Sequence, residues 1–290
     1  MSAVHITAAY AFFPIKEDSL PSLHDQLTAF GEERGMRGLI LIATEGINAT
    51  VSGNEEGIAE WKNLLRAMCP TIEFKDSSSD GHVFSRWSVK IKKEIVALKQ
   101  SGISPDGKRG HISPTEWNRM LNEEDVVVVD ARNDYEYQLG RFTDAINPAI
   151  NHFHQFSDFL AKAEIPKEKK VLVYCTGGIR CEKALIAMEQ AGYKHVYQLD
   201  GGILKYLEEC PEQKFEGECF VFDERVAVDQ HLRPSSVYTL CAFHGTPAKH
   251  AIYCAECDQP ASVCDVCFPD SAKHFCSKRC GNERTVIFIV

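Results

Sequence analysis

The sequence contains no long apolar run. No stretch approaches the ~18–20 apolar residues that a helix needs to span a bilayer. The first residues, Met1-Ser2-Ala3-Val4-His5, also lack the basic, then apolar, then small-residue layout of a secretory signal peptide. We therefore expect a cytoplasmic protein that has no membrane partner.

An excess of basic residues is also absent. The 32 Lys and Arg are outnumbered by 41 Asp and Glu, and the formal net charge is -9. This balance excludes a uniformly basic surface for a polyanion, and DNA is not expected as a partner. A local basic face is still open, because Arg86-Trp87 and Lys90-Ile91-Lys92-Lys93 share an expected strand and Lys99, Lys108 and Arg109 follow. From the residues alone, a solvated strand face is the simpler interpretation.

Two common redox signatures are missing. The chain has no Gly-x-Gly-x-x-Gly fingerprint of a dinucleotide-binding domain. It also shows no recognisable set of two histidines and one carboxylate for a non-haem iron. No electron donor is therefore predicted from a motif.

The length of 290 residues predicts two or three domains. Residues 1–98 have the pattern of a ferredoxin-like (acylphosphatase-like) α+β domain in the order βαββαβ. The expected strands are 4–13, 39–44, 47–52 and 84–98, with helices from 19 and over 54–68. A loop is expected at Ser77-Ser78-Ser79-Asp80-Gly81, before the last of these strands.

Residues 99–121 are rich in Gly, Pro and Ser and predict a linker, with a helix beginning near Ser113-Pro114. Residues 122–218 alternate in the α/β manner. The apolar runs 126–129, 171–174 and 195–199 are typical of a parallel sheet covered on both faces. Asp130 and Cys175 fall at the carboxyl ends of two of these strands, where such sheets carry their chemistry.

The segment Cys175-Thr176-Gly177-Gly178-Ile179-Arg180 lies between a buried strand and a helix. Its backbone N–H groups can curl into an anion-binding nest, to which the following helix adds its positive end. The glycines permit the tight turn, and Arg180 adds a fixed charge. These features predict a nucleophilic thiolate, or a persulfide, at Cys175. A buried structural cysteine is the plainer alternative. For Cys181 we favour inward packing over a resolving role.

Seven of the twelve cysteines lie in the last fifty residues, within a cysteine-rich module expected at 219–290. They form Cys241-x-x-His244, Cys254-x-x-Cys257, Cys264-x-x-Cys267 and Cys276-x-x-x-Cys280. Ligand pairs at this spacing suit tetrahedral zinc, and eight ligands would serve two structural ions. His250 and His274 are substitutes. A metal-free reduced segment, or one oxidised to disulfides on isolation, is the alternative.

Several motifs resemble a known family of domains. Asp130-Ala131-Arg132 with Tyr135-Glu136 and Gly140–Asn147 is similar to the opening signature of rhodanese domains, and Asp200–Tyr206 to the closing one. The six-residue loop from Cys175 to Arg180 matches sulfur-transferring rhodaneses, whereas the related phosphatases have a loop one residue longer. The resemblance implies a rhodanese domain over 122–218, with Cys175 and Arg180 catalytic and Asp130 supporting.

A wider resemblance covers nearly the whole chain. The motifs Thr44–Gly53, Phe84–Val96, Cys175–Lys183 and Val221–Val228 together resemble the TrhO family, whose members are tRNA uridine(34) hydroxylases. The tail of that family opens with Cys-x-x-Cys, whereas this chain has His244 in the second position.

The resemblance implies oxygen-dependent hydroxylation of the wobble uridine of tRNA to 5-hydroxyuridine. The anticodon region would then be the partner and O2 a co-substrate. Two alternatives stay open from the residues. One is a rhodanese-type sulfurtransferase that uses a Cys175 persulfide. The other is a zinc-dependent RNA- or protein-binding module, against which the intact Cys175 loop argues.

Overall fold

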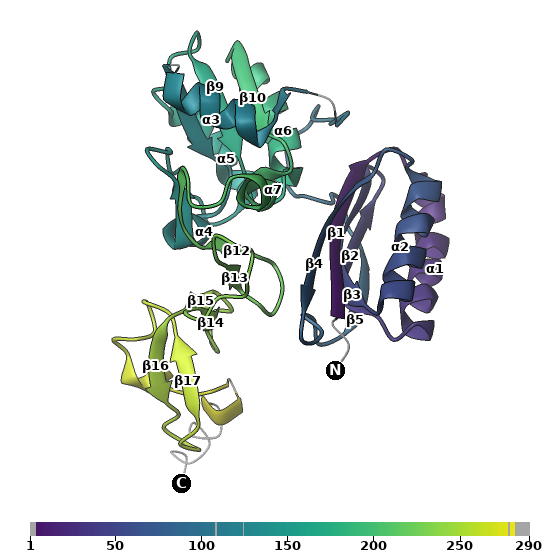
Figure 1. Cartoon of the computed structure of the whole chain (residues 1–290), viewed down its shortest axis with the longest axis vertical. Coiled ribbons are helices and arrows are strands. Elements are labelled where there is room, and N and C mark those ends of the chain that lie inside the picture. The colour runs from purple at the N-terminus through teal and green to yellow at the C-terminus, as the bar shows by residue number, and fades with distance from the viewer. Residues whose placement is uncertain (1–3, 108, 124, 278, 282–290) are drawn as a thin grey trace.

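A computed structural model describes residues 4–281 of the chain, except 108, 124 and 278 (Figure 1). Lys108 and the end of the expected cysteine-rich tail therefore lie outside the described residues. No helix in the described part is long and apolar enough to cross a membrane.

The N-terminal domain is a five-stranded sheet with two helices on one face. Its elements are β1 (Val4–Phe12), a short 3-10 turn η1 (Glu17–Ser19), α1 (Leu20–Glu33), β2 (Arg37–Ala43), β3 (Gly46–Gly53), α2 (Glu55–Met68), β4 (Glu73–Ser79) and β5 (Trp87–Ile91). The strand order β4-β1-β3-β2-β5, with β4-β1-β3-β2 antiparallel, confirms the ferredoxin-like domain.

One assignment within this domain was wrong. The fourth strand of the ferredoxin-like order is β4, which includes Ser77, Ser78 and Ser79, and these serines are not in a loop. Residues 84–98, which were expected to form the last strand, contain only the short strand β5. This strand is an addition to the ferredoxin-like order and runs parallel to β2. Trp87 of β5 packs edge-on against Trp61 under the helices, so it does not join a basic outer face.

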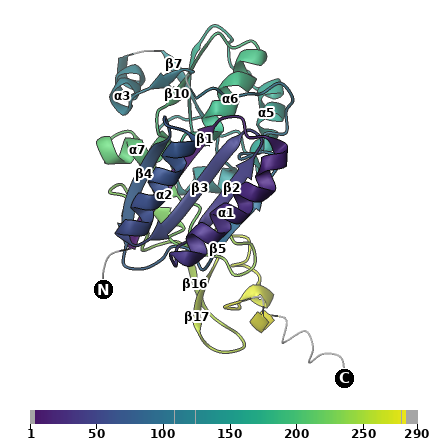
Figure 2. The same cartoon turned by 90° about the vertical axis from the view of Figure 1, so that its right-hand side faces the viewer.

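The two faces of this sheet have different partners. Ala9, Ile40 and Ala49 pack in the core with Ile58 and Trp61 of α2. Alternation along a strand turns the neighbouring side chains to the opposite face. In Figures 1 and 2 the helices α1 and α2 lie on the outer side, and the other face of the sheet is turned toward the rest of the chain.

The central domain is built on a parallel sheet in the order β6-β10-β9-β7. Its elements are β6 (His111–Ile112), α3 (Pro114–Glu123), β7 (Val126–Asp130), α4 (Asp134–Leu139), β8 (Gly140–Phe142), η2 (Phe153–Gln155), α5 (Phe156–Lys162), β9 (Lys170–Tyr174), α6 (Ile179–Gln190), β10 (His195–Leu199) and α7 (Gly202–Glu209). The three expected apolar strands are confirmed. Because β6 and α3 belong to this domain, the predicted linker 99–121 extends too far.

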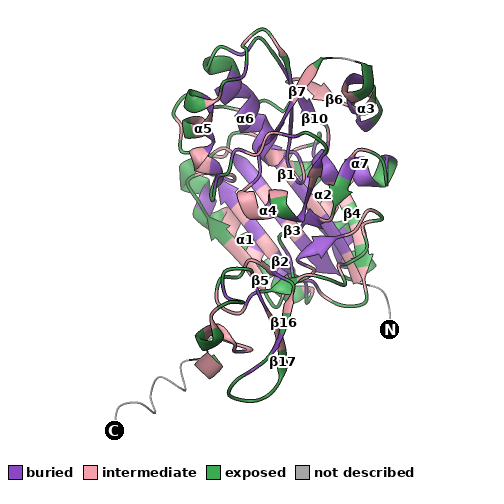
Figure 3. Cartoon of the chain, turned by 90° about the vertical axis from the view of Figure 1, so that its left-hand side faces the viewer, coloured by how far each residue is buried: buried purple, intermediate pink, exposed green. Residues whose placement is uncertain are grey.

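The end of the chain continues the central domain before it forms a separate module. Strand β11 (Phe215–Gly217) pairs with β8, and Cys219 and Val221 lie in the core of the central domain. The remaining strands are the short pairs β12 (Cys219–Phe220) with β13 (Ala227–Val228), β14 (Thr239–Leu240) with β15 (Pro247–Ala248), and β16 (His250–Tyr253) with β17 (Pro260–Val263), followed by η3 (Ser271–Lys273). Figure 3 shows that buried residues concentrate in the two large sheets, whereas the last module is mostly exposed or half-buried.

A buried lysine joins the N-terminal and central domains. The side chain of Lys183 in α6 is only 2% exposed, and its Nζ lies 2.8 Å from Glu45 Oε2 and 2.6 Å from Glu94 Oε2. One residue earlier, Glu182 accepts a hydrogen bond of 3.2 Å from the Tyr10 hydroxyl of β1. The helix that follows the Cys175 loop is therefore tied directly to the N-terminal domain.

Replacing this lysine tests the connection. Lys183→Met leaves two carboxylates together without their cation, and we expect a loss of about 2 kcal/mol of unfolding free energy, since the carboxylates keep some solvent contact. The measurement is urea-induced unfolding. Lys194→Met, which breaks the exposed Lys194–Glu168 pair, is the control and should change stability by less than about 0.5 kcal/mol. Equal effects of the two variants would refute a role of Lys183 in joining the domains.

Candidate active site

The loop after β9 forms the predicted nest around a thiol. The backbone N–H of Gly178 donates to Cys175 Sγ at 3.1 Å. Gly178 has a φ of 98°, and a Cβ there would lie 2.8 Å from the Tyr10 hydroxyl. A Cβ on Gly202 would lie 2.5 Å from the Cys175 carbonyl oxygen. Glycine at these positions lets the loop curl tightly between α7 and the N-terminal sheet.

A buried ion pair fixes the cation of the loop. Arg180 Nη1 and Nη2 donate to the two carboxylate oxygens of Glu136 at 2.6 and 2.7 Å. The Thr176 hydroxyl donates to Glu136 at 3.1 Å, and all three side chains are buried. Although burial opposes both charges, the attraction between them lowers the pKa of Glu136 and raises that of Arg180.

This setting favours the thiolate at Cys175. Burial by itself raises the pKa of the thiol. A hydrogen bond with Cys181, the charge of Arg180 and backbone N–H groups outweigh burial and lower that pKa to about 6. Burial and the neighbouring Cys175 raise the pKa of Cys181, which is fully buried. Cys181 therefore packs inward, as we favoured, and stabilises its neighbour.

The expected supporting role of Asp130 does not match its position, and Glu136 has a partner that the sequence analysis did not predict. Asp130 is fully buried and paired with Arg132 at 2.6 Å, and it does not line the cavity at Cys175. Glu136 is instead the carboxylate that lies beside the Cys175 loop. The sequence analysis names this residue only as part of the opening rhodanese signature. The spacing Asn133-x-x-Glu136 fits a capping box at the start of α4, in which Glu136 accepts from the Asn133 backbone, and this unused sequence signal would have fixed Glu136 at the helix start.

The thiol opens into a cavity of about 640 Å³ between the domains. Thr176, Gly177, Ile179 and Arg180 line it together with Cys175, so the predicted loop residues meet there. Gly178 contributes its N–H to the thiol.

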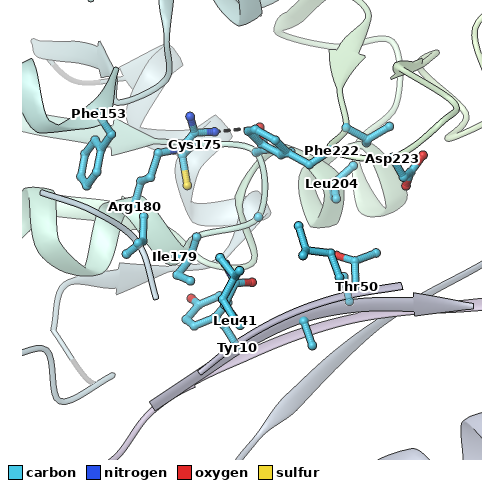
Figure 4. A pocket seen from close by; sticks show the side chains of 18 of the residues that line it. Tyr10, Leu41, Thr50, Phe153, Cys175, Ile179, Arg180, Leu204, Phe222 and Asp223 are labelled. Atoms are coloured by element: carbon cyan, nitrogen blue, oxygen red, sulfur yellow. Dashed lines mark hydrogen bonds between the residues drawn. The ribbon is translucent and has the colours of Figure 1, made fainter. Parts of the chain in front are cut away.

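The N-terminal sheet forms the opposite wall of the cavity. Figure 4 shows Cys175 and Arg180 on one side and Tyr10, Leu41 and Thr50 of the sheet on the other. The face of the ferredoxin-like sheet that lies opposite α1 and α2 is therefore the floor of the site.

Side chains from two other regions complete the wall. Phe222, Asp223 and Arg225 come from the segment after the central domain, and Arg225 Nη1 donates to Ser77 Oγ of β4 at 3.2 Å. Lys75, also on β4, adds a cation whose pKa is lowered by burial. The cavity therefore combines a thiolate, polar side chains and apolar walls.

The cysteine-rich module contains two groups of four metal-ligand side chains. Cys241, His244, Cys264 and Cys267 form one group, and Cys254, Cys257, Cys276 and Cys280 form the other. All eight predicted ligands are thus brought together, in an interleaved order along the chain. His250 is instead paired with Asp265, and His274 lies against the Phe268 carbonyl, so neither belongs to a group.

Comparisons with known proteins agree with this division of the chain. The UPF0176 acylphosphatase-like domain matches residues 4–95, the rhodanese-like domain 113–209 and the rhodanese C-terminal domain 216–281. A tRNA uridine(34) hydroxylase of Bdellovibrio bacteriovorus is 43% identical, over 96% of this chain and 81% of that protein. A protein of the same name from Legionella pneumophila (strain Paris) is 40% identical, over 80% of this chain and 93% of its own length.

The chain belongs to the tRNA uridine(34) hydroxylase family. A solved rhodanese-like domain from Anabaena is also similar, with 20% identity, a TM-score of 0.33, and coverage of 38% of this chain and 80% of its own.

The four motifs that resemble the hydroxylase family converge at one place. Asn48 of the first motif lines the cavity, as do Phe84 of the second, Cys175 of the third and Phe222 of the fourth. The first two motifs also supply Glu45 and Glu94, the partners of Lys183 in the third. Segments spread over most of the sequence therefore build a single interdomain site.

The acidity of the thiol can be measured directly. We expect the rate of Cys175 alkylation by iodoacetamide, followed by peptide mass spectrometry, to rise with a midpoint near pH 6, because the thiolate is the reactive form. Cys181→Ala should move the midpoint to higher pH, since it removes a hydrogen bond to the thiolate. Cys69→Ala, which removes a half-buried cysteine away from the cavity, is the control and should leave the midpoint unchanged. A midpoint above pH 8 in the wild type would contradict the stabilised thiolate.

Proposed function

We propose that this protein hydroxylates the uridine at position 34 of tRNA to 5-hydroxyuridine in an O2-dependent reaction at Cys175. The observation that carries the proposal is the coincidence of a thiolate-stabilising loop with an interdomain cavity built from all four family motifs. The family relatives named tRNA uridine(34) hydroxylase support the reaction and its substrate. Because tRNA is its proposed substrate, we also propose that the protein acts in the cytoplasm.

The cavity suits a single base that has left its stack. Position 34 lies in the anticodon loop, where unpaired bases can be splayed out and held against protein side chains. A volume of about 640 Å³ falls in the range of small-ligand sites. Asn48 and Thr50 offer hydrogen-bonding groups on the floor, whereas Leu39, Leu41 and Ile179 offer apolar surface for the ring.

The thiolate gives Cys175 a direct role in the reaction. In our proposal, Sγ adds to C6 of uracil, and the electron pair of the C5–C6 double bond moves to C5 and the O4 carbonyl. The electron-rich C5 then takes one oxygen atom from O2. The second atom leaves as water with two electrons and two protons from an external reductant. Loss of the C5 proton and of the thiolate restores the double bond. Arg180, held by Glu136, keeps the thiol ionised before the addition.

A second candidate function is sulfur transfer. The six-residue loop and the N–H of Gly178 aimed at Sγ would stabilise a Cys175 persulfide as well as a thiolate. In that reaction thiosulfate gives its outer sulfur to Cys175 and leaves as sulfite, and a thiol or cyanide accepts the sulfur. The cavity is large enough for a base, whereas sulfur transfer from a small donor does not need that room, so hydroxylation is our first choice.

The principal experiment follows the modified nucleoside. The gene is deleted in its source organism and restored as wild type, Cys175→Ser or Cys69→Ser, and tRNA nucleosides are analysed by mass spectrometry. We expect 5-hydroxyuridine and its derivatives to fall in the deletion strain and to return with wild type and Cys69→Ser only. Cys69 is half-buried and away from the cavity, which makes it a matched control.

Two outcomes would contradict the proposal. Restoration of 5-hydroxyuridine by Cys175→Ser would remove the thiol from the reaction. Unchanged 5-hydroxyuridine in the deletion strain, together with thiocyanate formation from thiosulfate and cyanide that is lost in Cys175→Ser, would establish sulfur transfer instead.

We also propose that the two ligand groups each hold a structural zinc ion. The Sγ atoms of Cys257 and Cys276 are 3.5 Å apart, and those of Cys241 and Cys267 3.8 Å apart. Two thiolates on a tetrahedral zinc are about 3.8 Å apart when each Zn–S bond is ~2.3 Å. His244 Nδ1 lies 3.1 Å from Cys264 Sγ, so the histidine fits the first group as its fourth ligand. Four protein ligands leave no open position, and the ions would serve the fold of the module.

Metal analysis of the purified protein tests this proposal. We expect two zinc ions per chain, one for each ligand group. Cys280→Ser should lower the content toward one, because three ligands bind zinc much more weakly than four. Cys210→Ser removes a cysteine that belongs to neither group and should keep two. Less than one zinc per chain in the wild type would reject the two-site arrangement.

A further inference from the structure

A second hollow lies beside the cavity at Cys175. It has a volume of about 360 Å³ and shares with the cavity the residues Leu39, Phe84, Val221, Phe222 and Asp223. We call this hollow the outer groove. It runs along the outer strand β5, where Ser88 and Lys90 line it, to Leu240 and Gly245 of the C-terminal module. The shared lining places the groove directly beside the cavity.

An exposed aromatic ring lies where the groove and the cavity meet. Phe222 is 56% exposed, although neighbouring Val221 and Asp223 are buried. The ring packs edge-on against Phe220 at 4.9 Å and lies 5.5 Å from the Arg180 guanidinium. Its contacts hold the ring in place, and its open surface faces both hollows. An aromatic fixed in this way is a platform on which a base can stack.

Two cations line the groove, and neither forms an ion pair with a carboxylate in the part of the chain that the structure describes. They are Arg86 and Lys90, which are both exposed. Of the acids in the lining, Asp223 is paired with Arg225 at 2.6 Å, and Glu224 is exposed. The chain has a net charge of -9, yet among the described residues of this groove the two unpaired cations outnumber the one unpaired acid, Glu224. Together with the fixed aromatic ring, this local excess of positive charge suits an anionic strand.

We propose that the outer groove binds the single-stranded RNA next to the uridine that enters the cavity. Phe222 stacks on the adjoining base, and Arg86 and Lys90 contact the phosphates beside it. The inference deepens the proposed function and rests on it, because it assigns the flanking nucleotides of the same RNA. The position of the groove argues for this occupant, since the groove adjoins the cavity at Phe222 and offers a path along β5 to a strand whose base enters the cavity.

Binding is measured by fluorescence anisotropy with a labelled anticodon stem-loop RNA that carries U34, at several salt concentrations. The full-length Cys175→Ser protein is the background, so that no reaction occurs. Phe222→Ala should weaken binding roughly tenfold, and Phe222→Trp should restore it, because stacking on an aromatic ring is tolerant of its type. Each of Arg86→Ala and Lys90→Ala should reduce the slope of log K against log salt by about 0.7.

Matched variants separate the groove from general charge effects. Glu224→Gln removes a negative charge from the lining and should tighten binding, whereas Lys194→Ala, in an exposed pair with Glu168, should leave the slope unchanged. Thermal unfolding of every variant confirms that it is folded. Wild-type affinity and salt slope in Phe222→Ala and Arg86→Ala would overturn the inference while leaving the hydroxylation proposal intact. Failure of the wild type to modify U34 in the deletion experiment would instead overturn the function itself.

Discussion

The buried thiolate of Cys175 is the charge on which the arrangement of this molecule depends. A negative charge at full burial is stable only if fixed dipoles and a cation replace water around it. The N–H of Gly178 and the Arg180 guanidinium meet that need. Arg180 is itself buried and therefore needs Glu136, whose carboxylate also accepts from Thr176. The chain thus encloses a series of alternating charges that runs from α4 to the thiol.

The same constraint explains why three regions of the chain meet at this loop. A rhodanese loop by itself ends at the open edge of a parallel sheet, where water screens its charges. Here the sheet of the N-terminal domain covers that edge, with Tyr10 against Gly178 and Lys183 between Glu45 and Glu94. The segment carrying Phe222 and Arg225 closes a further side and is attached to β4 through Ser77. With less water around the Cys175 loop, the electrostatic interactions among its charged groups are stronger.

The features that could be predicted from the sequence are those formed by residues close together along the chain. The Cys175 loop was clear because strand, cysteine, two glycines, arginine and helix are contiguous. The spacing also identified the eight cysteine and histidine side chains that gather in two groups, although Cys241 and His244 depart from the Cys-x-x-Cys pattern. Glu136 was missed as a partner of Arg180 because 44 residues separate them and only the folded sheet brings them together. Strand β4 was missed because its last residues are three serines on an edge strand, without an apolar alternation. Trp87 was placed wrongly, since a one-residue step along β5 moves a side chain to the other face.

The room in front of Cys175 depends on small side chains on the floor of the cavity, and this room bears on the choice between the two candidate chemistries. On the floor, Ala8 and Thr50 are paired across β1 and β3, and the same row of the sheet ends in Lys75 on β4. Larger residues in that row would fill the space in front of Cys175 and leave room only for a small sulfur donor. An open loop would admit any thiol. A loop that faces a floor of short side chains leaves room for a flat ring beside the thiol, and this room supports our choice of base chemistry over sulfur transfer.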